Sequence, residues 1–66
     1  MKDNQFGKNL KYLRLNAHLS QQKLADLLEV SNQLVSFWES GKREPNLDAL
    51  LKIAKCFNTS VDELLK

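Results

Sequence analysis

SQQKLADLLEVSNQLVSFWESG, residues 20–41, holds two short helical patterns with almost no spacer between them. Ser20 and Ser31 can each begin a helix, because a serine hydroxyl accepts a backbone N–H two or three residues further along. Gly41 suits the end of the second pattern, since glycine readily adopts the left-handed conformation that stops a helix. The stretch therefore predicts two helices joined by a turn of about three or four residues.

Apolar side chains fall on one face of each predicted helix. In the first, residues 21–28, leucines recur at spacings i, i+3 and i+4: Leu24, Leu27 and Leu28. In the second, residues 32–40, Val35 and Trp38 are three apart and should face inward. Such a pair is the helix-turn-helix layout, in which the second helix enters the major groove of DNA and the first lies across the backbone.

The composition fits one small domain spanning residues 1–66. A chain this short buries only about 60% of its unfolded surface, so modest stability is expected. The hydrophobic content of 42% indicates a globular chain, and no apolar run approaches the length of a membrane span. A net charge of +2 does not by itself indicate nucleic acid. The N-terminus has no apolar signal core and one cysteine permits no internal disulfide, so a cytoplasmic location is predicted.

A helix before this stretch is predicted from about Asp3 or Asn4 to Asn16. One apolar stripe runs along it at spacings i, i+4, i+7 and i+11: Phe6, Leu10, Leu13 and Ala17. The basic side chains lie mostly off the stripe, on a face that is either solvated or in contact with DNA: Lys8, Lys11 and Arg14. The chain must then turn without a glycine, so Asn16 or His18 is expected to adopt a positive φ.

The outward side of the second helix carries the predicted base-reading residues. Asn and Gln side chains can pair bidentately with adenine, and both types occur there, at Asn32 and Gln33, with Ser36 close by. Leu34 lies near the boundary of this side. An outward Phe37 has three interpretations: contact with thymine methyl groups, contact with a protein partner, or partial packing against a neighbour.

Two further pairs of residues are predicted to contact DNA phosphates. Gln21 and Gln22 lie in the first turn of their helix, beside free backbone N–H groups and the positive end of the helix dipole. Lys42 and Arg43 follow Gly41, where they would meet a phosphate just past the second helix. Phosphate contacts fix the register of a protein on DNA, whereas base contacts read its sequence.

The remainder of the chain predicts two more helices. Asn46 is the expected N-cap of a helix from about Leu47 to Phe57, whose apolar face is spaced i, i+3, i+4 and i+7: Leu50, Ile53, Ala54 and Phe57. Within it, Cys56 is expected to be a small, half-buried hydrophobic residue. Asn58 is a candidate left-handed stop. A short last helix follows, opened by a capping box: Ser60 and Glu63.

Taken together, these residues resemble the Xre/Cro-like, phage-repressor-type helix-turn-helix family. The resemblance extends from about Phe6 to Leu65, and its motifs are specific in combination rather than singly. The positions that carry it are Leu19, Ser20, Gln21, Leu24, Ala25, Val30, Ser31, Ser36, Trp38, Glu39, Gly41, Lys42, Pro45, Leu50, Ile53 and Ala54. The resemblance implies an all-α fold, a compact five-helix bundle of the lambda-repressor type, which binds a palindromic DNA operator as a homodimer.

The resemblance also implies roles for individual residues. A structural ion pair is implied between Arg14 and Glu39, which assigns Arg14 more to the fold than to DNA. Phosphate contacts are implied at Gln21, Lys42 and Arg43. Base contacts are implied at Asn32, Gln33, Leu34 and Phe37, with Ser36 close by. The dimer interface is implied at Val61, Leu64 and Leu65.

The sequence departs from the family pattern at two kinds of position. His18 and Glu29 stand where relatives often have glycine, so both should carry some backbone strain. Leu34 and Phe37 stand where relatives often place polar or basic base-reading residues, which favours apolar contact with thymine methyl groups and leaves the operator sequence open.

Two classes of function follow. The first is a cytoplasmic transcriptional regulator, expected to be a repressor in the sense that a bound dimer would occlude a promoter. The alternative is a protein-interaction module on the same fold, in the manner of an antitoxin or anti-regulator, with Phe37 gripping a protein partner. The sequence has no metal-ligand spacing, phosphate loop or catalytic triad, so no enzyme activity, metal or cofactor is expected.

Overall fold

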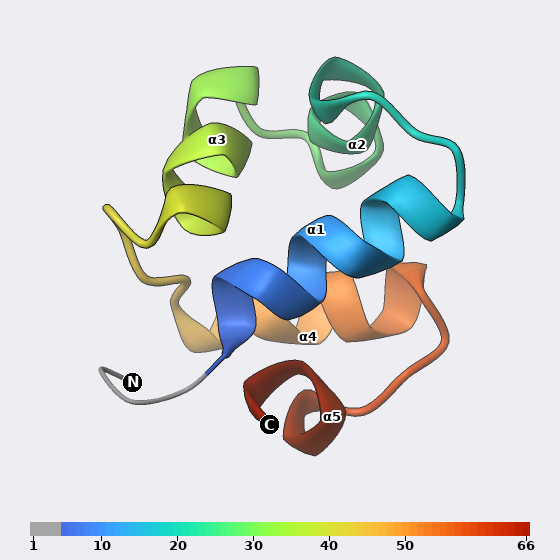
Figure 1. Ribbon diagram of the computed structural model, residues 1–66, viewed down its shortest axis with the longest axis vertical. Helices are drawn as coiled ribbons and strands as arrows, with labels where there is room; N and C mark the ends of the chain where they lie inside the picture. The colour runs from blue at the N-terminus through green and yellow to red at the C-terminus, as the bar shows by residue number, and fades with distance from the viewer. Residues whose placement is uncertain (1–4) are drawn as a thin grey trace.

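The computed structural model describes residues 5–66, which form five helices and no strand (Figure 1). In chain order these are α1 (Phe6–Asn16), α2 (Gln21–Leu28), α3 (Asn32–Ser40), α4 (Leu47–Cys56) and α5 (Val61–Leu65). The predicted all-α five-helix fold is confirmed. The predicted starts of the first helix, Asp3 and Asn4, lie outside the described residues, and α4 ends one residue before Phe57. None of the helices in this part of the chain is long and apolar enough to cross a bilayer.

Four of the five helices begin at a side-chain cap, as predicted. Each capping oxygen accepts the backbone N–H of the third residue along, at 2.8–3.1 Å: Ser20, Ser31, Asn46 and Ser60. The capping box of α5 is only half formed. The carboxylate of Glu63 instead accepts a hydrogen bond from Lys66 Nζ at 2.9 Å. These caps satisfy N–H groups that a helix leaves unpaired, and they fix where α2 and α3 start.

Each of the first four helices is followed by a residue with positive φ, which turns the chain. The residues and their φ angles are His18 at 60°, Glu29 at 61°, Gly41 at 82° and Asn58 at 53°. The expectation of a left-handed residue at Asn16 or His18 is thus met by His18. The turn between α2 and α3 is short because Glu29 reverses the chain at once and Ser31 begins the next helix.

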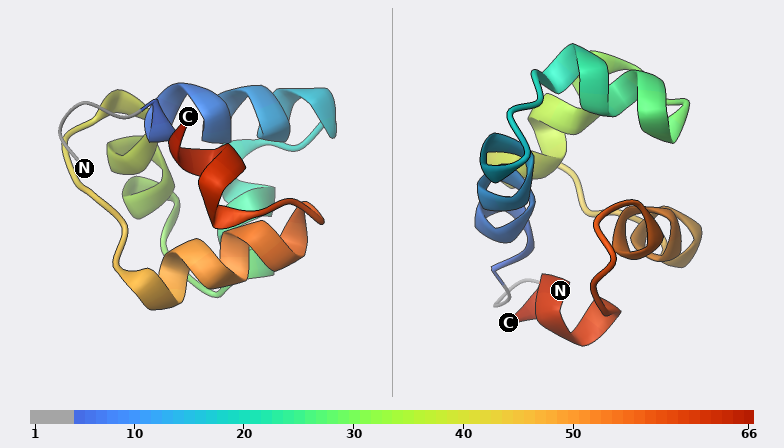
Figure 2. Two further views of the ribbon diagram at one scale, coloured as in Figure 1. Left: turned by 90° about the horizontal axis from the view of Figure 1, so that it is seen from below. Right: turned by 90° about the vertical axis from the view of Figure 1, so that its right-hand side faces the viewer.

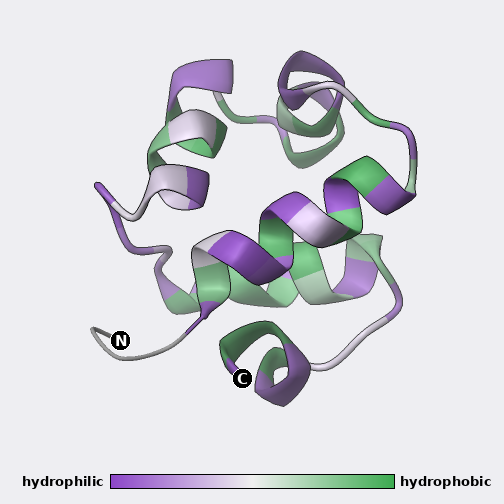
Figure 3. Ribbon diagram, viewed as in Figure 1, coloured by the Kyte–Doolittle hydropathy of each residue, from purple (hydrophilic) through white to green (hydrophobic). Residues whose placement is uncertain are grey.

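One apolar core joins all five helices. α1 packs against α3 and α5, α2 packs against α3 and α4, and α4 packs against α5. Figure 2 shows α5 lying between the ends of α1 and α4, and Figure 3 shows apolar and polar stretches on every helix. Each helix contributes a side chain with no exposed surface: Leu10, Leu24, Val35, Ile53 and Leu64.

Three side chains predicted to be buried or half-buried are exposed, so these predictions were wrong. Leu27 is 53% exposed, because α3 and α4 cover α2 only on the side of Leu24 and Leu28. Ala17 follows the last residue of α1, where the chain leaves the apolar stripe. Cys56 is exposed at the end of α4.

Gly7 lies where α1 meets the backbone of the last turn of α3. A β-carbon at this position would lie 2.7 Å from the carbonyl oxygen of Trp38 and 2.8 Å from that of Glu39. Beside it, the rings of Phe6 and Trp38 pack edge to face, with centroids 6.3 Å apart and an interplanar angle of 80°. Because glycine has no side chain, the start of α1 can rest directly on the backbone at the end of α3.

Candidate nucleic-acid interface

The outward side of α3 is available, and its inward side is anchored. Val35 and Trp38 are 0% and 3% exposed, which confirms that these two residues hold the helix against the core. Asn32 and Gln33, in the first turn, are exposed. Ser36 lies one turn further along and is half-buried. The residues predicted to read bases therefore begin at the N-terminal end of α3, the end that base-reading helices insert into the groove.

The two apolar residues of α3 are less exposed than their predicted role suggests. Leu34 and Phe37 are both half-buried. The Lys42 ammonium lies 5.8 Å from the centre of the Phe37 ring, close enough for a cation–π contact. Partial packing, one of the three interpretations of Phe37, is what the structure shows. The apolar surface that Phe37 could offer to DNA or protein is correspondingly small.

The loop after α3 presents two cations. Lys42 and Arg43 are exposed, and their backbone N–H groups both donate to the carbonyl oxygen of Phe37, at 2.9 and 3.3 Å. These bonds tie the loop to the last turn of α3. Two cationic side chains thus extend from a backbone that is tied to the end of α3, where phosphate contact was predicted.

The two glutamines at the start of α2 have different surroundings. Gln22 is exposed and its Nε2 donates to Asp26 Oδ1 of the same helix at 2.9 Å. Gln21 is half-buried, and its Nε2 donates to Glu39 Oε1 at 3.1 Å. This contact between α2 and α3 was not predicted. A glutamine at the start of a helix indicates phosphate contact only, and the sequence spacing of Gln21 and Glu39 does not indicate that they are in contact.

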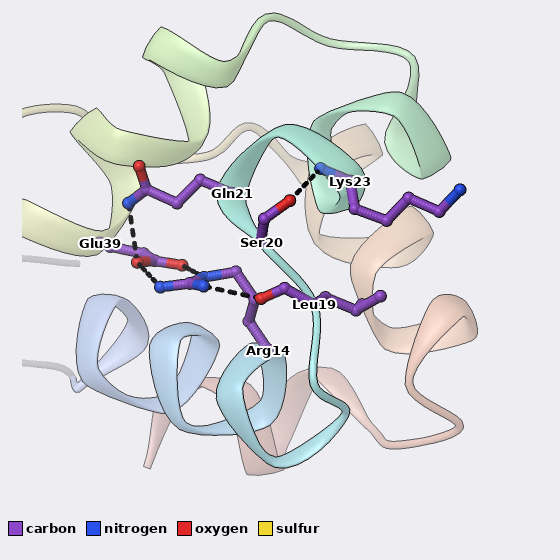
Figure 4. Close-up of polar contacts among 6 residues, drawn as sticks. All are labelled: Arg14, Leu19, Ser20, Gln21, Lys23 and Glu39. Carbon is purple, nitrogen blue, oxygen red and sulfur yellow. Dashed lines mark hydrogen bonds and ion pairs between the residues drawn. The ribbon is translucent and has the colours of Figure 1, made fainter.

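The predicted ion pair between Arg14 and Glu39 is present and bidentate. Arg14 Nε lies 2.7 Å from Glu39 Oε2, and Arg14 Nη2 lies 3.1 Å from Oε1 (Figure 4). Arg14 Nη1 also donates to the carbonyl oxygen of Leu19 at 2.8 Å. The two side chains are 9% and 5% exposed, so Arg14 belongs to the interior and not to a solvated basic face. The guanidinium joins α1 to the loop before α2 and to α3.

The residues predicted for the dimer interface divide into two groups. Leu64 is completely enclosed by the chain's own core, so the prediction that it contacts a second copy was wrong. Val61 and Leu65 are half-buried and retain some free surface. On the neighbouring helix α4, Leu47 and Leu51 are 66% and 53% exposed, and sequence periodicity did not single them out.

Comparison with known proteins gives matches over nearly the whole chain. A helix-turn-helix family model matches residues 10–64. The HTH-type transcriptional activator BcrR of Enterococcus faecalis is 44% identical over 61 residues, which cover 92% of this chain and 30% of BcrR. The restriction-modification controller protein C.AhdI of Aeromonas hydrophila has a TM-score of 0.84 at 34% identity, with 92% of each chain covered.

The same arrangement of helices also occurs within a different kind of protein. Hydroxypropylphosphonic acid epoxidase from S. wedmorenis has a TM-score of 0.88 at 30% identity, and the match covers 100% of this chain and 36% of the epoxidase. The chain spans between 30% and 56% of the length of BcrR and the next four curated relatives. A large part of each of those proteins therefore lies outside the matched region.

Proposed function

Because this chain belongs to the Xre/Cro-type helix-turn-helix family, we propose that it binds double-stranded DNA as a homodimer and regulates transcription, most simply as a repressor. In this role α3 lies in the major groove and α2 lies across the backbone. A regulator of this kind acts on DNA in the cytoplasm, and it needs no catalytic step, metal or cofactor.

The orientation of α3 is the observation that carries this proposal. Val35 and Trp38 fasten one side of the helix to the core, while Asn32 and Gln33 project from the other. Asparagine and glutamine supply both a donor and an acceptor, which is the pairing that adenine offers in the major groove. A base-reading surface needs such groups on a fixed backbone, and α3 meets both conditions.

The cations at the end of α3 support backbone contact. With α3 in the groove, the loop carrying Lys42 and Arg43 lies where the groove gives way to the phosphate backbone. Each cation that neutralises a phosphate steepens the salt dependence of binding by about 0.9 in the plot of log K against log salt concentration. Lys42→Ala and Arg43→Ala should each reduce that slope by about one, with little change in sequence preference.

The apolar surface of α4 and α5 supports the dimerisation part of the proposal. Leu47 and Leu51 are exposed on α4, and Val61 and Leu65 keep partial exposure on α5, which packs against α4. A two-fold dimer through this surface would present two copies of α3. Palindromic half-sites would then be centred one helical turn, roughly 34 Å, apart.

Selection of bound sequences from a random duplex pool tests the proposal. We expect enrichment of a palindrome with half-site centres one helical turn apart, and an affinity for it that falls steeply as salt rises. A paired Asn32→Ala and Gln33→Ala variant is the control, since it should keep salt-dependent binding and lose the enrichment. No enriched sequence, together with no salt dependence, would refute DNA binding altogether.

Phe37 distinguishes DNA from a protein partner as the target of α3. Its ring is half-buried and in contact with Lys42, so truncation removes little free apolar surface. On DNA, Phe37→Ala should shift the preferred operator at the base pairs nearest the ring and leave binding intact. If α3 instead gripped a protein, the same change should abolish capture of that protein, because buried aromatic residues dominate such interfaces.

A further inference from the structure

One carboxylate lies at the junction of α1, α2 and α3. Glu39 stands in the last turn of α3, and its side chain is only 5% exposed. Its Oε1 accepts two hydrogen bonds, from Arg14 Nη2 and from Gln21 Nε2, both at 3.1 Å (Figure 4). Its Oε2 accepts from Arg14 Nε at 2.7 Å. The carboxylate therefore contacts the end of α1 and the start of α2 together.

The bond to Glu39 determines which way round the Gln21 amide lies. A carboxylate only accepts hydrogen bonds, so it pairs with the amide NH₂ and not with the amide carbonyl. Figure 4 shows the nitrogen of Gln21 directed at Glu39 and the carbonyl oxygen directed away. An amide NH₂ has two N–H groups, and Glu39 takes one of them. The second remains for another acceptor.

Arg14 makes this arrangement compatible with a nearby phosphate. An unpaired carboxylate beside the N-terminus of α2 would repel an anion that binds there. The bidentate guanidinium places a full positive charge against both oxygens of Glu39 and so neutralises it. The phosphate site at the start of α2 is then left with the N–H groups and the positive end of the helix dipole.

We propose that Glu39 is a positioning residue for DNA binding, which orients the Gln21 amide so that its second N–H is available to a phosphate. This inference rests on the proposed DNA-binding function and adds to it a role for a residue that does not touch DNA. Without Glu39, the Gln21 amide would be free to turn its carbonyl oxygen toward the phosphate, where it would repel rather than bind.

Gln22 provides a matched control. It is the same residue type, the next in sequence, and in the same first turn of α2. Its Nε2 bonds Asp26 and not Glu39. If Glu39 acts through Gln21, removal of Glu39 should reduce the loss of affinity caused by Gln21→Ala and should leave the loss caused by Gln22→Ala unchanged. If Glu39 only maintains the fold, its removal should affect the contributions of Gln21 and Gln22 alike.

The experiment is a pair of double-mutant cycles on the affinity for the duplex recovered by selection, at a temperature where every variant is folded by circular dichroism. Gln21→Ala and Glu39→Gln should each weaken binding by about tenfold, the size expected for one hydrogen bond to a charged group. Their combination should weaken it by little more than either change alone. The losses from Gln22→Ala and Glu39→Gln should instead multiply.

The outcomes separate this inference from the function on which it rests. No binding of any duplex by the unmodified protein would refute the proposed function and this inference with it. Suppose that the unmodified protein binds DNA, but the loss of affinity from Gln21→Ala multiplies with that from Glu39→Gln, as it does for Gln22→Ala. That result would refute the positioning role and leave the proposed function standing. Equal coupling of both glutamines to Glu39 would do the same, because it would indicate a general effect on the fold.

A second measurement needs no change at Glu39, in case Glu39→Gln does not fold. In the unmodified protein, the two side-chain amide protons of Gln21 can be followed by NMR as the duplex is added. One proton should keep the chemical shift of its bond to Glu39, and the other should move on binding. Movement of both protons would show that Gln21 leaves Glu39 to reach DNA, and it would overturn the proposal.

Discussion

Substitution of Gly7 by alanine tests the packing of α1 on α3. Alanine is the better helix former, so propensity alone predicts a gain of about 1 kcal/mol. The structure predicts the opposite sign, since the new β-carbon would lie 2.7 and 2.8 Å from two carbonyl oxygens. Those oxygens belong to the backbone of α3, which cannot rotate away as a flexible side chain would. One of the two effects must dominate, and their magnitudes decide which.

Overpacking typically costs about 1–3 kcal/mol, and two backbone contacts under 3 Å belong at the upper end of that range. Subtracting the propensity gain of about 1 kcal/mol leaves a net loss of about 2 kcal/mol. A domain of this size has about 3–10 kcal/mol of stability in total. At roughly 4–8 °C per kcal/mol, the melting temperature should fall by about 8–16 °C.

Urea denaturation followed by the fluorescence of Trp38, with thermal melts by circular dichroism, measures this loss. Lys8→Ala is the matched control, because its side chain is exposed on the same turn and its change should stay within about 0.5 kcal/mol. Gly41→Ala isolates backbone strain, since φ there is 82° and a β-carbon would meet nothing within 4 Å. A Gly7→Ala protein as stable as the original would refute the close contact between α1 and α3.

Three other substitutions have outcomes that the structure specifies. Arg14→Met leaves the Glu39 carboxylate buried without its cation and should lower the free energy of unfolding by about 3–5 kcal/mol. Adding Glu39→Met should restore most of that loss. Equal losses for the single and the double variant in urea denaturation would contradict this. Glu29→Gly removes left-handed strain of about 1–2 kcal/mol and adds the smaller entropy cost of glycine. The free energy of unfolding should therefore rise by about 0.5–1 kcal/mol. A lower melting temperature would count against this prediction. Cys56→Ser should change stability by less than about 0.5 kcal/mol, and the thiol of the folded protein should react with a disulfide reagent as quickly as a free thiol; protection would disprove its exposure.

Features set by local chemistry were predictable from the sequence. The N-caps of α2 and α3 and the left-handed residues after them depend on a few neighbouring residues, and the structure has them where the sequence places them. The inward direction of Val35 and Trp38 follows from their spacing alone. The pairing of Arg14 with Glu39 was available only through the family resemblance, because the two residues are 25 positions apart.

Features set by which helix covers which face were not predictable in this way. Periodicity put Leu27 on the apolar face of α2, but the width of that face depends on how α3 and α4 lie over it. Leu64 was assigned to a partner and instead fills the core, since α5 folds back onto α1 and α4. The role of Gly7 could not be predicted, because hydrophobic periodicity does not reveal where two helix backbones come into close contact.

The links among α1, α2 and α3 have a consequence for how any target is met. Arg14, Glu39 and Gln21 join all three helices through their side chains, and Gly7 brings α1 into backbone contact with the end of α3. A tilt of α3 alone would break these contacts, so they couple the three helices to one another. A target whose geometry differs from the preferred one would not be accommodated by tilting α3 alone. In the proposed dimer, adjustment falls to side-chain rotamers and to the spacing between the two copies, and the heat-capacity change of association should reflect the surface covered and not an ordering of the protein.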